Sequence, residues 1–286
     1  MTHSPLSRKA NRMNSDMEKD MTNARIAGIS RLRMETDGPG IRTLVHLSGC
    51  RLDCAYCLNG NLRSGRVGTL HEPEALLDRV RKDDIYFRAS GGGITFGGGE
   101  PLLHSRFIRE FKQMCPPEWT ITVETSLNVP KEDLERLLDA VDLWIVDIKD
   151  LDPGRYLEYT GESNEHVLEN LDLLRERCVP AKVRVRVPWI GGLNTPEDVN
   201  GSAEAIRAMG FETEVFKYVI PDHLLKEASG EECLTGDLLT TGDEAEAMSK
   251  RSPWNEIVWK RFCQEMERLS LLGFYDEMEH DDDWED

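Results

Sequence analysis

The sequence predicts an α/β fold, a partial (β/α)6 TIM-like barrel with parallel strands inside and helices outside. Short runs rich in β-branched and aromatic residues alternate with longer helical stretches. Several of these runs are almost continuously apolar, as buried parallel strands are. A closed barrel needs eight strand–helix repeats and about 250 residues, whereas six repeats are visible in this chain. We therefore expect an open barrel.

The elements follow each other in regular order. The predicted strands span residues 42–48, 94–97, 119–125, 142–148, 182–188 and 213–220. The predicted helices span residues 72–83, 103–115, 130–140, 164–178 and 196–209. Proline suits the first turn of a helix, and Pro130 and Pro196 stand at two predicted starts. The pair Ser163 and Asn164 supplies side chains that can cap the first of the last two helices, and Thr195 supplies one for the second.

Composition limits the classes of partner. The net charge of -18 argues against a nucleic-acid partner, because a phosphate backbone attracts a basic face. No run of residues approaches the ~20 apolar positions that a membrane span needs, and no signal peptide is visible. We expect a cytoplasmic protein, where thiols stay reduced.

Four regions are expected along the chain. They are a mobile leader over 1–23, the barrel over 24–225, a helical extension over 226–275 and an acidic tail over 276–286. Eight of the last eleven residues are acidic, a composition typical of a solvated tail.

Three cysteines follow the first predicted strand in the run GCRLDCAYCLNG. Cys50, Cys54 and Cys57 place three thiolates in one short loop. One disulfide would leave the third cysteine unpaired, and a tetrahedral zinc site would want a fourth ligand nearby. An iron–sulfur cluster held by three thiolates would leave one iron open for a ligand that is not protein. From the spacing alone, three alternatives remain: a zinc site, a purely structural cluster, or three cysteines that are buried or stray and bind nothing.

Polar residues follow the other predicted strands, at the edge where an α/β fold gathers its functional groups. Consecutive glycines in Gly97–Pro101 allow a backbone to approach a ligand closely. Glu124 and Thr125 end the third strand, where an apolar core would otherwise continue. Asp147 and Lys149 end the fourth strand, as a structural ion pair or as groups that hold a ligand. In the fifth strand, Val183, Val185 and Val187 alternate with Arg184 and Arg186, so Arg186 faces either the site or a salt partner outside it.

Longer motifs narrow these possibilities. The chain reads DGPGIRT over 37–43, C-x3-C-x2-C over 50–57, SGGG and then GGGEP over 90–101, DIK over 147–149 and RVPWIGGLN over 186–194. With these motifs the chain resembles the radical SAM enzymes, and within them the activating enzymes of glycyl-radical enzymes. The resemblance covers roughly residues 27 to 223 and includes no second cysteine-rich insert. It therefore implies a single 4Fe–4S cluster.

The resemblance also implies roles for residues. Cys50, Cys54 and Cys57 resemble the cluster ligands. The positions that resemble contacts of S-adenosylmethionine (SAM) are Tyr56, Leu58, Gly98, Gly99, Glu100, Asp147, Ile148, Lys149 and His223. Their place at the predicted strand ends adds Glu124, Thr125 and Arg186 as expected SAM contacts. The other cysteines, Cys115, Cys178, Cys233 and Cys263, have no ligand spacing and are interpreted as core or surface thiols.

The implied activity is an oxidoreductase reaction under anaerobic conditions. The reduced cluster would cleave SAM to a 5′-deoxyadenosyl radical, which abstracts a hydrogen from a glycine of a partner glycyl-radical enzyme. A flavodoxin or ferredoxin would donate the electron. Beyond residue 223 the sequence diverges from the family, so hydrogen abstraction from a small molecule or a peptide is the alternative. A non-catalytic binding module is a third hypothesis, under which the GGE and DIK motifs would be incidental.

Overall fold

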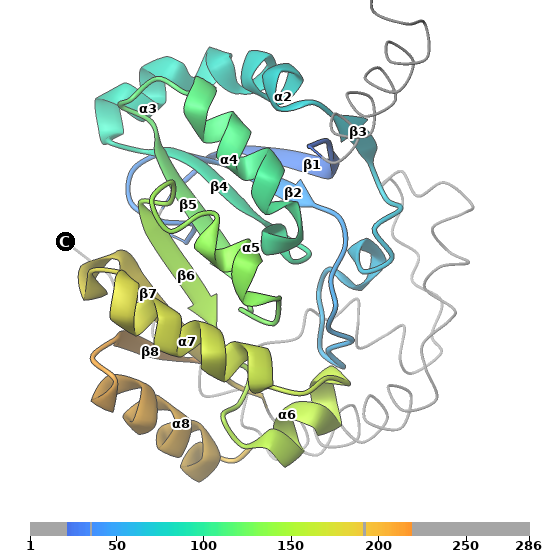
Figure 1. Ribbon diagram of the computed structural model, residues 1–286, viewed down its shortest axis with the longest axis vertical. Coiled ribbons are helices and arrows are strands. Elements are labelled where there is room, and N and C mark those ends of the chain that lie inside the picture. The colour runs from blue at the N-terminus through green and yellow to red at the C-terminus, as the bar shows by residue number, and fades with distance from the viewer. Residues whose placement is uncertain (1–21, 35, 191–192, 219–286) are drawn as a thin grey trace, which may run out of the picture.

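A curved eight-stranded sheet organises the chain, and helices cover its outer face (Figure 1). The computed structural model describes residues 22–34, 36–190 and 193–218. The strand order is β3-β1-β2-β4-β5-β6-β7-β8. Neighbours from β2 to β8 in this order pair in parallel, so six parallel strands follow each other across the sheet. In the described residues β3 and β8 are the two ends of the sheet and do not pair, which confirms the open barrel.

The elements have the following bounds. The strands are β1 (Ala24–Arg33), β2 (Arg42–Leu47), β3 (Thr69–His71), β4 (Gly93–Gly98), β5 (Thr120–Thr125), β6 (Leu143–Asp147), β7 (Val183–Trp189) and β8 (Glu212–Lys217). The α-helices are α2 (Pro73–Val80), α3 (Asp84–Ser90), α4 (Ser105–Met114), α5 (Lys131–Glu135), α6 (Pro153–Thr160), α7 (Glu165–Arg177) and α8 (Pro196–Ala208). Short 3-10 turns are η1 (Gly60–Leu62), η2 (Arg81–Asp83), η3 (Pro101–His104) and η4 (Pro180–Lys182).

All six predicted strands are present, and the structure adds two more. β1 pairs antiparallel with both β2 and β3. The sequence of β1 shows no clean alternation, because the register shifts between Ile26 and Gly28 and again between Ser30 and Arg33. Each shift inserts residues that break the period of two on which a strand is recognised.

The helices differ from expectation at three places. The stretch predicted as one helix over 72–83 is α2 followed by η2, and α3 continues it. The helix predicted over 130–140 has regular α-helical geometry only in α5. α6 was not predicted, although Asp152 caps it by accepting from the amide of Arg155 at 2.9 Å and Pro153 stands at its first turn.

The predicted caps of the last two helices behave differently. Thr195 forms a reciprocal capping box with Asp198 at the start of α8, where Pro196 takes the first helical position as predicted. Asn164 occupies the N-cap of α7 but makes no capping hydrogen bond with its side chain. Its amide nitrogen donates instead to the carbonyl of Leu151, so it fastens the loop before α6.

The parallel strands separate an apolar face from a polar one. Outward residues such as Phe96, Val123 and Val185 are fully buried against the helices. Phe96 meets the rings of Phe107 and Phe111 on α4 edge-on, at centroid distances of 6.4 and 5.4 Å. The inward residues are mostly polar or charged and are taken from β4 to β7: Thr95, Gly97, Thr122, Glu124, Ile145, Asp147, Arg184 and Arg186. This polar interior is where the site lies.

Arg42 closes the amino end of the barrel. It is fully buried, and its guanidinium donates to Thr95 Oγ1 at 2.7 Å and Thr120 Oγ1 at 2.9 Å. It also donates to the carbonyls of Pro39, Ile94 and Thr120 at 3.2, 2.7 and 3.1 Å. Arg42 therefore joins three neighbouring strands, β2, β4 and β5, at the end opposite the predicted site.

None of the described helices combines the length and the apolar character that crossing a bilayer requires.

Candidate active site

The cysteine loop lies between β2 and β3 and is held by backbone hydrogen bonds to α6. The amides of Asp53 and Ala55 donate to the carbonyls of Thr160 and Tyr159, at 2.8 and 3.0 Å, at the end of that helix. The amide of Gly49 donates to the carbonyl of Leu62 at 2.7 Å, which folds the two ends of the loop together. In Figure 1 this light-blue loop lies beyond the carboxyl end of β2, close to α6.

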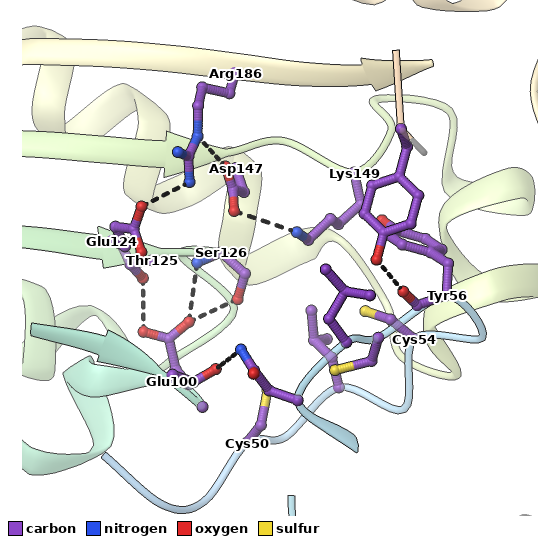
Figure 2. A pocket seen from close by; sticks show the side chains of 17 residues that line it. Cys50, Cys54, Tyr56, Glu100, Glu124, Thr125, Ser126, Asp147, Lys149 and Arg186 are labelled. Atoms are coloured by element: carbon purple, nitrogen blue, oxygen red, sulfur yellow. Dashed lines mark hydrogen bonds and ion pairs between the residues drawn. The ribbon is translucent and has the colours of Figure 1, made fainter. Parts of the chain in front are cut away.

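The three cysteines line one pocket. Cys50, Cys54 and Cys57 are all half-buried, and Figure 2 shows two of them, Cys50 and Cys54, at its floor. Burial raises the pKa of the Cys50 and Cys54 thiols to about 12, so both are protonated at neutral pH until a metal displaces the proton. Among the residues that the structure describes, no three His, Cys, Asp or Glu side chains stand close enough to hold one metal ion. A cubane cluster has no such requirement, because each cysteine binds a different iron.

The glycine loop after β4 packs directly on the cysteine loop. The amide of Gly99 donates to the carbonyl of Leu47 at 2.8 Å, and the amide of Glu100 donates to the carbonyl of Gly49 at 2.7 Å. A Cβ on Gly99 would lie 2.2 Å from that Gly49 carbonyl oxygen, so only glycine fits. The side chain of Asn59 donates to the carbonyl of Gly98 at 3.1 Å from the opposite side.

Glu100 connects the glycine loop to the end of β5. Its carboxylate accepts from Thr125 Oγ1 at 2.6 Å, from Ser126 Oγ at 2.7 Å and from the Ser126 amide at 2.9 Å. The amide of Leu102 donates to it as well, at 3.1 Å. Burial raises the pKa of Glu100, and these hydrogen bonds offset the rise only in part. The side chain of Glu100 is thus engaged in positioning, and its backbone lies at the pocket.

A chain of four charged side chains crosses the strand ends from β5 to β7 (Figure 2). Arg186 Nη2 donates to Glu124 Oε1 at 3.0 Å, and Arg186 Nε donates to Asp147 Oδ1 at 2.7 Å. Lys149 Nζ stands 3.5 Å from Asp147 Oδ2. These charges line the pocket and keep between 16% and 25% of their side-chain surface exposed.

The two carboxylates of this chain differ in their pKa values. Burial raises the pKa of Glu124, and Arg186 offsets this only in part. Burial acts on Asp147 in the same direction, but Lys149 and Arg186 together outweigh it and lower its pKa. Asp147 is therefore the firmly ionised member, held between two cations.

Aromatic rings form the wall beside the cysteines. The Tyr56 ring is buried and lies 5.9 Å from the ring of Tyr159 and 5.1 Å from the ring of Tyr218. Lys149 Nζ stands 5.9 Å from the centre of the Tyr56 ring, within the range of a cation–π contact. Leu58 lines the pocket with half of its surface exposed. These side chains make one side of the pocket apolar and leave the opposite side charged.

The structure gathers most of the predicted residues at this one pocket. Those that line it are Cys50, Cys54, Tyr56, Cys57, Leu58, Gly98, Gly99, Glu100, Glu124, Thr125, Asp147, Lys149 and Arg186. Ile148 does not line it, since its side chain is fully buried in the core and its amide donates to the carbonyl of Arg186 at 3.0 Å. His223 lies outside the described residues, as do Cys233 and Cys263.

Four pocket residues were not predicted as site residues. Leu52, Asn59, Ser126 and Tyr218 line the pocket beside the predicted groups. Leu52 lies within the cysteine loop, Asn59 stands directly after it, and Ser126 follows Thr125 at a strand end. Tyr218 carries no motif, and only the curvature of the sheet brings it to residue 56.

Comparison with models of protein families shows to which superfamily the chain belongs. The model of the radical SAM superfamily matches residues 44–221, which include the cysteine loop, the glycine loop and every strand end described above. The chain belongs to the radical SAM superfamily.

Its relatives within the superfamily are activating enzymes. The chain is 34% identical over 181 residues to the pyruvate formate-lyase-activating enzyme of Listeria monocytogenes, a match that covers 60% of this chain and 72% of the relative. It is 27% identical over 257 residues to the indoleacetate decarboxylase activating enzyme of Tractidigestivibacter scatoligenes, covering 66% and 80% of the two chains. Both the superfamily and the activating-enzyme resemblance predicted from the motifs are confirmed.

A solved structure supports the fold. Streptococcus suis SuiB bound to the precursor peptide SuiA superposes with a TM-score of 0.51 at 13% sequence identity. The match covers 83% of this chain and 48% of SuiB, so this radical SAM chain spans about half the length of that protein. At this identity the likeness concerns the fold alone.

Membership of the superfamily specifies the cofactors, a 4Fe–4S cluster and SAM. The residues present fit both. Three thiols face one pocket for the cluster, and a glycine-lined backbone with paired charges borders the same space for a zwitterionic amino acid group. Cys115 and Cys178 lie at the ends of α4 and α7, away from the pocket, as predicted for thiols that are not ligands.

Proposed function

We propose that this radical SAM enzyme activates a partner protein by taking a hydrogen atom from one of its glycines, as a glycyl-radical-enzyme activase. One observation carries the proposal: the relatives of this chain are named as activating enzymes, and they act on several different target enzymes. The match to the first of these covers 72% of its length, so the likeness includes most of that activase.

The pocket supports a division of roles. Cys50, Cys54 and Cys57 are proposed as the ligands of three irons. When bound, the cluster supplies one electron to SAM, whose C5′–S bond breaks to give methionine and a 5′-deoxyadenosyl radical that takes the glycine hydrogen. The chain's own residues bind, orient and shield these groups.

The methionine part of SAM is proposed to lie between the glycine loop and the charged chain. Carbonyls of Gly98 and Gly99 face its ammonium group, and Lys149 or Arg186 faces its carboxylate. Glu124 and Asp147 keep both cations in place. Thr125 lines the same pocket and donates its hydroxyl to Glu100 at 2.6 Å. Tyr56 and Leu58 offer apolar surface to the adenosine part, on the side of the pocket that holds the rings. The backbone at Ile148 and the side chain of His223 are retained as proposed contacts on the family pattern.

The electron donor is proposed to be a flavodoxin or ferredoxin, because a 4Fe–4S cluster accepts one electron at low potential. The reaction is proposed to take place in the cytoplasm, where the three thiols remain reduced before the cluster is assembled.

The test begins with SAM cleavage. Anaerobically reconstituted protein, given dithionite and SAM, is expected to release 5′-deoxyadenosine. Cys54→Ala is expected to lose both the cluster and the release, whereas Cys115→Ala, which changes a half-buried thiol outside the pocket, retains both. A Cys54→Ala protein that still cleaves SAM would show that the ligands are assigned wrongly.

A second measurement addresses the target. Incubation with a candidate glycyl-radical enzyme is expected to give the doublet of a glycyl radical in the EPR spectrum of that partner. Release of 5′-deoxyadenosine that depends on a small molecule or on a peptide, with no radical on any candidate enzyme, would support the alternative substrate class instead.

A further inference from the structure

The two halves of the cysteine loop are held by different contacts. On one side, α6 receives the amides of Asp53 and Ala55, which fixes the first half of the loop. The second half, from Tyr56 to Cys57, is held within the loop by the amide of Cys57, which donates to the carbonyl of Cys54 at 3.1 Å. This second half carries the third cysteine and therefore sets where the third thiol points.

A distant residue reaches this second half. The hydroxyl of Tyr218 donates to the backbone carbonyl of Tyr56, 162 residues earlier in the sequence, and Figure 2 draws this bond beside the Tyr56 label. The carbonyl belongs to the peptide group that joins Tyr56 to Cys57. A hydrogen bond there restricts rotation of the peptide group next to the third ligand.

The two rings make a second contact. They meet edge-on, with centroids 5.1 Å apart and planes 72° apart, a favourable aromatic geometry. Tyr218 itself lines the pocket. It thus holds the loop by its hydroxyl and supplies pocket wall by its ring.

The position of Tyr218 in the fold gives the contact its significance. It follows β8, which is the last strand of the order and, in the described residues, has a strand partner on one side only. A complete barrel would close this side with further strands. Here a side-chain contact joins the last strand to the loop after the first parallel strand.

We propose that Tyr218 is a positioning residue that fixes the Tyr56–Cys57 peptide and so the orientation of the third cluster ligand, while its ring bounds the SAM pocket on the open side of the barrel. The inference rests on the proposed ligand role of Cys57. It concerns the retention of the cluster and the affinity for SAM, and it is independent of which partner is activated.

Tyr218→Phe tests the hydroxyl alone, since the ring contact remains. Tyr156→Phe is the matched control, because it removes another buried tyrosine hydroxyl, whose 2.9 Å hydrogen bond comes from the side chain of Asn128 and not from the backbone of the cysteine loop. Full-length wild type and both variants are reconstituted anaerobically, and loss of iron to excess chelator is followed. Tyr218→Phe is expected to lose iron about fivefold to tenfold faster than wild type, the equivalent of one lost hydrogen bond. Tyr156→Phe is expected to match wild type.

Tyr218→Leu tests the ring. It is expected to need a several-fold higher SAM concentration to change the EPR spectrum of the reduced cluster, since the pocket wall has been shortened. A Tyr218→Phe protein that releases iron at the wild-type rate, even with a lower melting temperature, would overturn the positioning role. If Tyr218→Leu shows the same dependence on SAM concentration as wild type, the proposal that the Tyr218 ring bounds the SAM pocket is wrong. A wild-type chain that takes up no cluster would contradict the proposed function itself, and this inference with it.

Discussion

Each end of the barrel interior contains an arginine, but the positive charge is surrounded by neutral oxygens at one end and by carboxylates at the other. At the amino end, Arg42 is completely enclosed, and all five of its hydrogen bonds go to neutral oxygens. At the carboxyl end, Arg186 pairs with two carboxylates and remains partly exposed beside the pocket. Burial lowers the pKa of Arg42 to about 10, whereas Asp147 and Glu124 outweigh the same effect and raise the pKa of Arg186.

This difference separates an arginine that is enclosed in the fold from one that borders the pocket. The five hydrogen-bond donors of Arg42 are engaged by groups on β4 and β5 and by the carbonyl of Pro39, so no capacity is left for a ligand. At the carboxyl end, cations and carboxylates neutralise each other and still border the pocket. A ligand that carries both a positive and a negative group can therefore form ion pairs with them in place of some of the pairs they form with each other. Substitutions at the two ends are therefore expected to affect different quantities.

The largest expected effect is on stability at the amino end. Arg42→Met removes a fully buried guanidinium and its five hydrogen bonds, including those to the buried Thr95 hydroxyl and the buried Ile94 carbonyl, so the free energy of unfolding is expected to fall by about 2–4 kcal/mol. Urea denaturation of the cluster-loaded protein measures it. SAM cleavage per folded molecule is expected to stay at the wild-type level. Equal stability of the variant and wild type would show that the enclosed arginine contributes nothing net.

A smaller effect is expected at the carboxyl end, and on activity. Arg186→Met leaves Glu124 and Asp147 without the cation between them, and SAM cleavage is expected to fall about 100-fold, or roughly 2.7 kcal/mol in the barrier. Release of 5′-deoxyadenosine measures it. Adding Glu124→Gln to this variant is expected to cost less than Glu124→Gln does in wild type, because the two side chains interact directly. Strictly additive losses would contradict the coupling.

The smallest effect is a pH dependence of stability. The pKa of Glu124 is raised in the folded state above its ordinary value of 4.5, so folding favours the protonated form. The stability linked to this group is complete below its ordinary pKa and is lost as the pH rises through the raised value. The difference in melting temperature, wild type minus Glu124→Gln, is expected to decrease with rising pH over that window and then level off. A difference that grows with pH would contradict the direction of the shift.

The sequence predicted the fold where local patterns and tertiary structure agree. The six parallel strands are continuous apolar runs or clean alternations, and all were found within a few residues of their predicted bounds. β1 was missed because its register shifts hide its periodicity. No helix was predicted between residues 148 and 164, although Asp152, Pro153 and Gly161 mark the two ends of α6.

The site was predicted to the extent that motifs specify it. Cysteine spacing, the glycine loop and the DIK strand end each occupy a few neighbouring residues, and their side chains do meet at the pocket. Ile148 was predicted as a site residue because it belongs to the DIK motif. Side chains alternate between the two faces of a strand, however, so Ile148 points away from the face that Asp147 and Lys149 share. The contact of Tyr218 with Tyr56 could not be predicted from the sequence, because it depends on how far the sheet curves and not on any local pattern.

The bond between the Gly49 carbonyl and the Glu100 amide, 2.7 Å long, makes the cysteine loop and the glycine loop one mechanical unit. The two loops are therefore expected to become ordered together. Removal of the iron that Cys50 is proposed to hold is expected to speed hydrogen exchange at the amides of Gly99 and Glu100, because both amides bond to the segment that leads into Cys50. A cluster bound at the cysteines would then also keep the glycine loop in place for a ligand in the pocket.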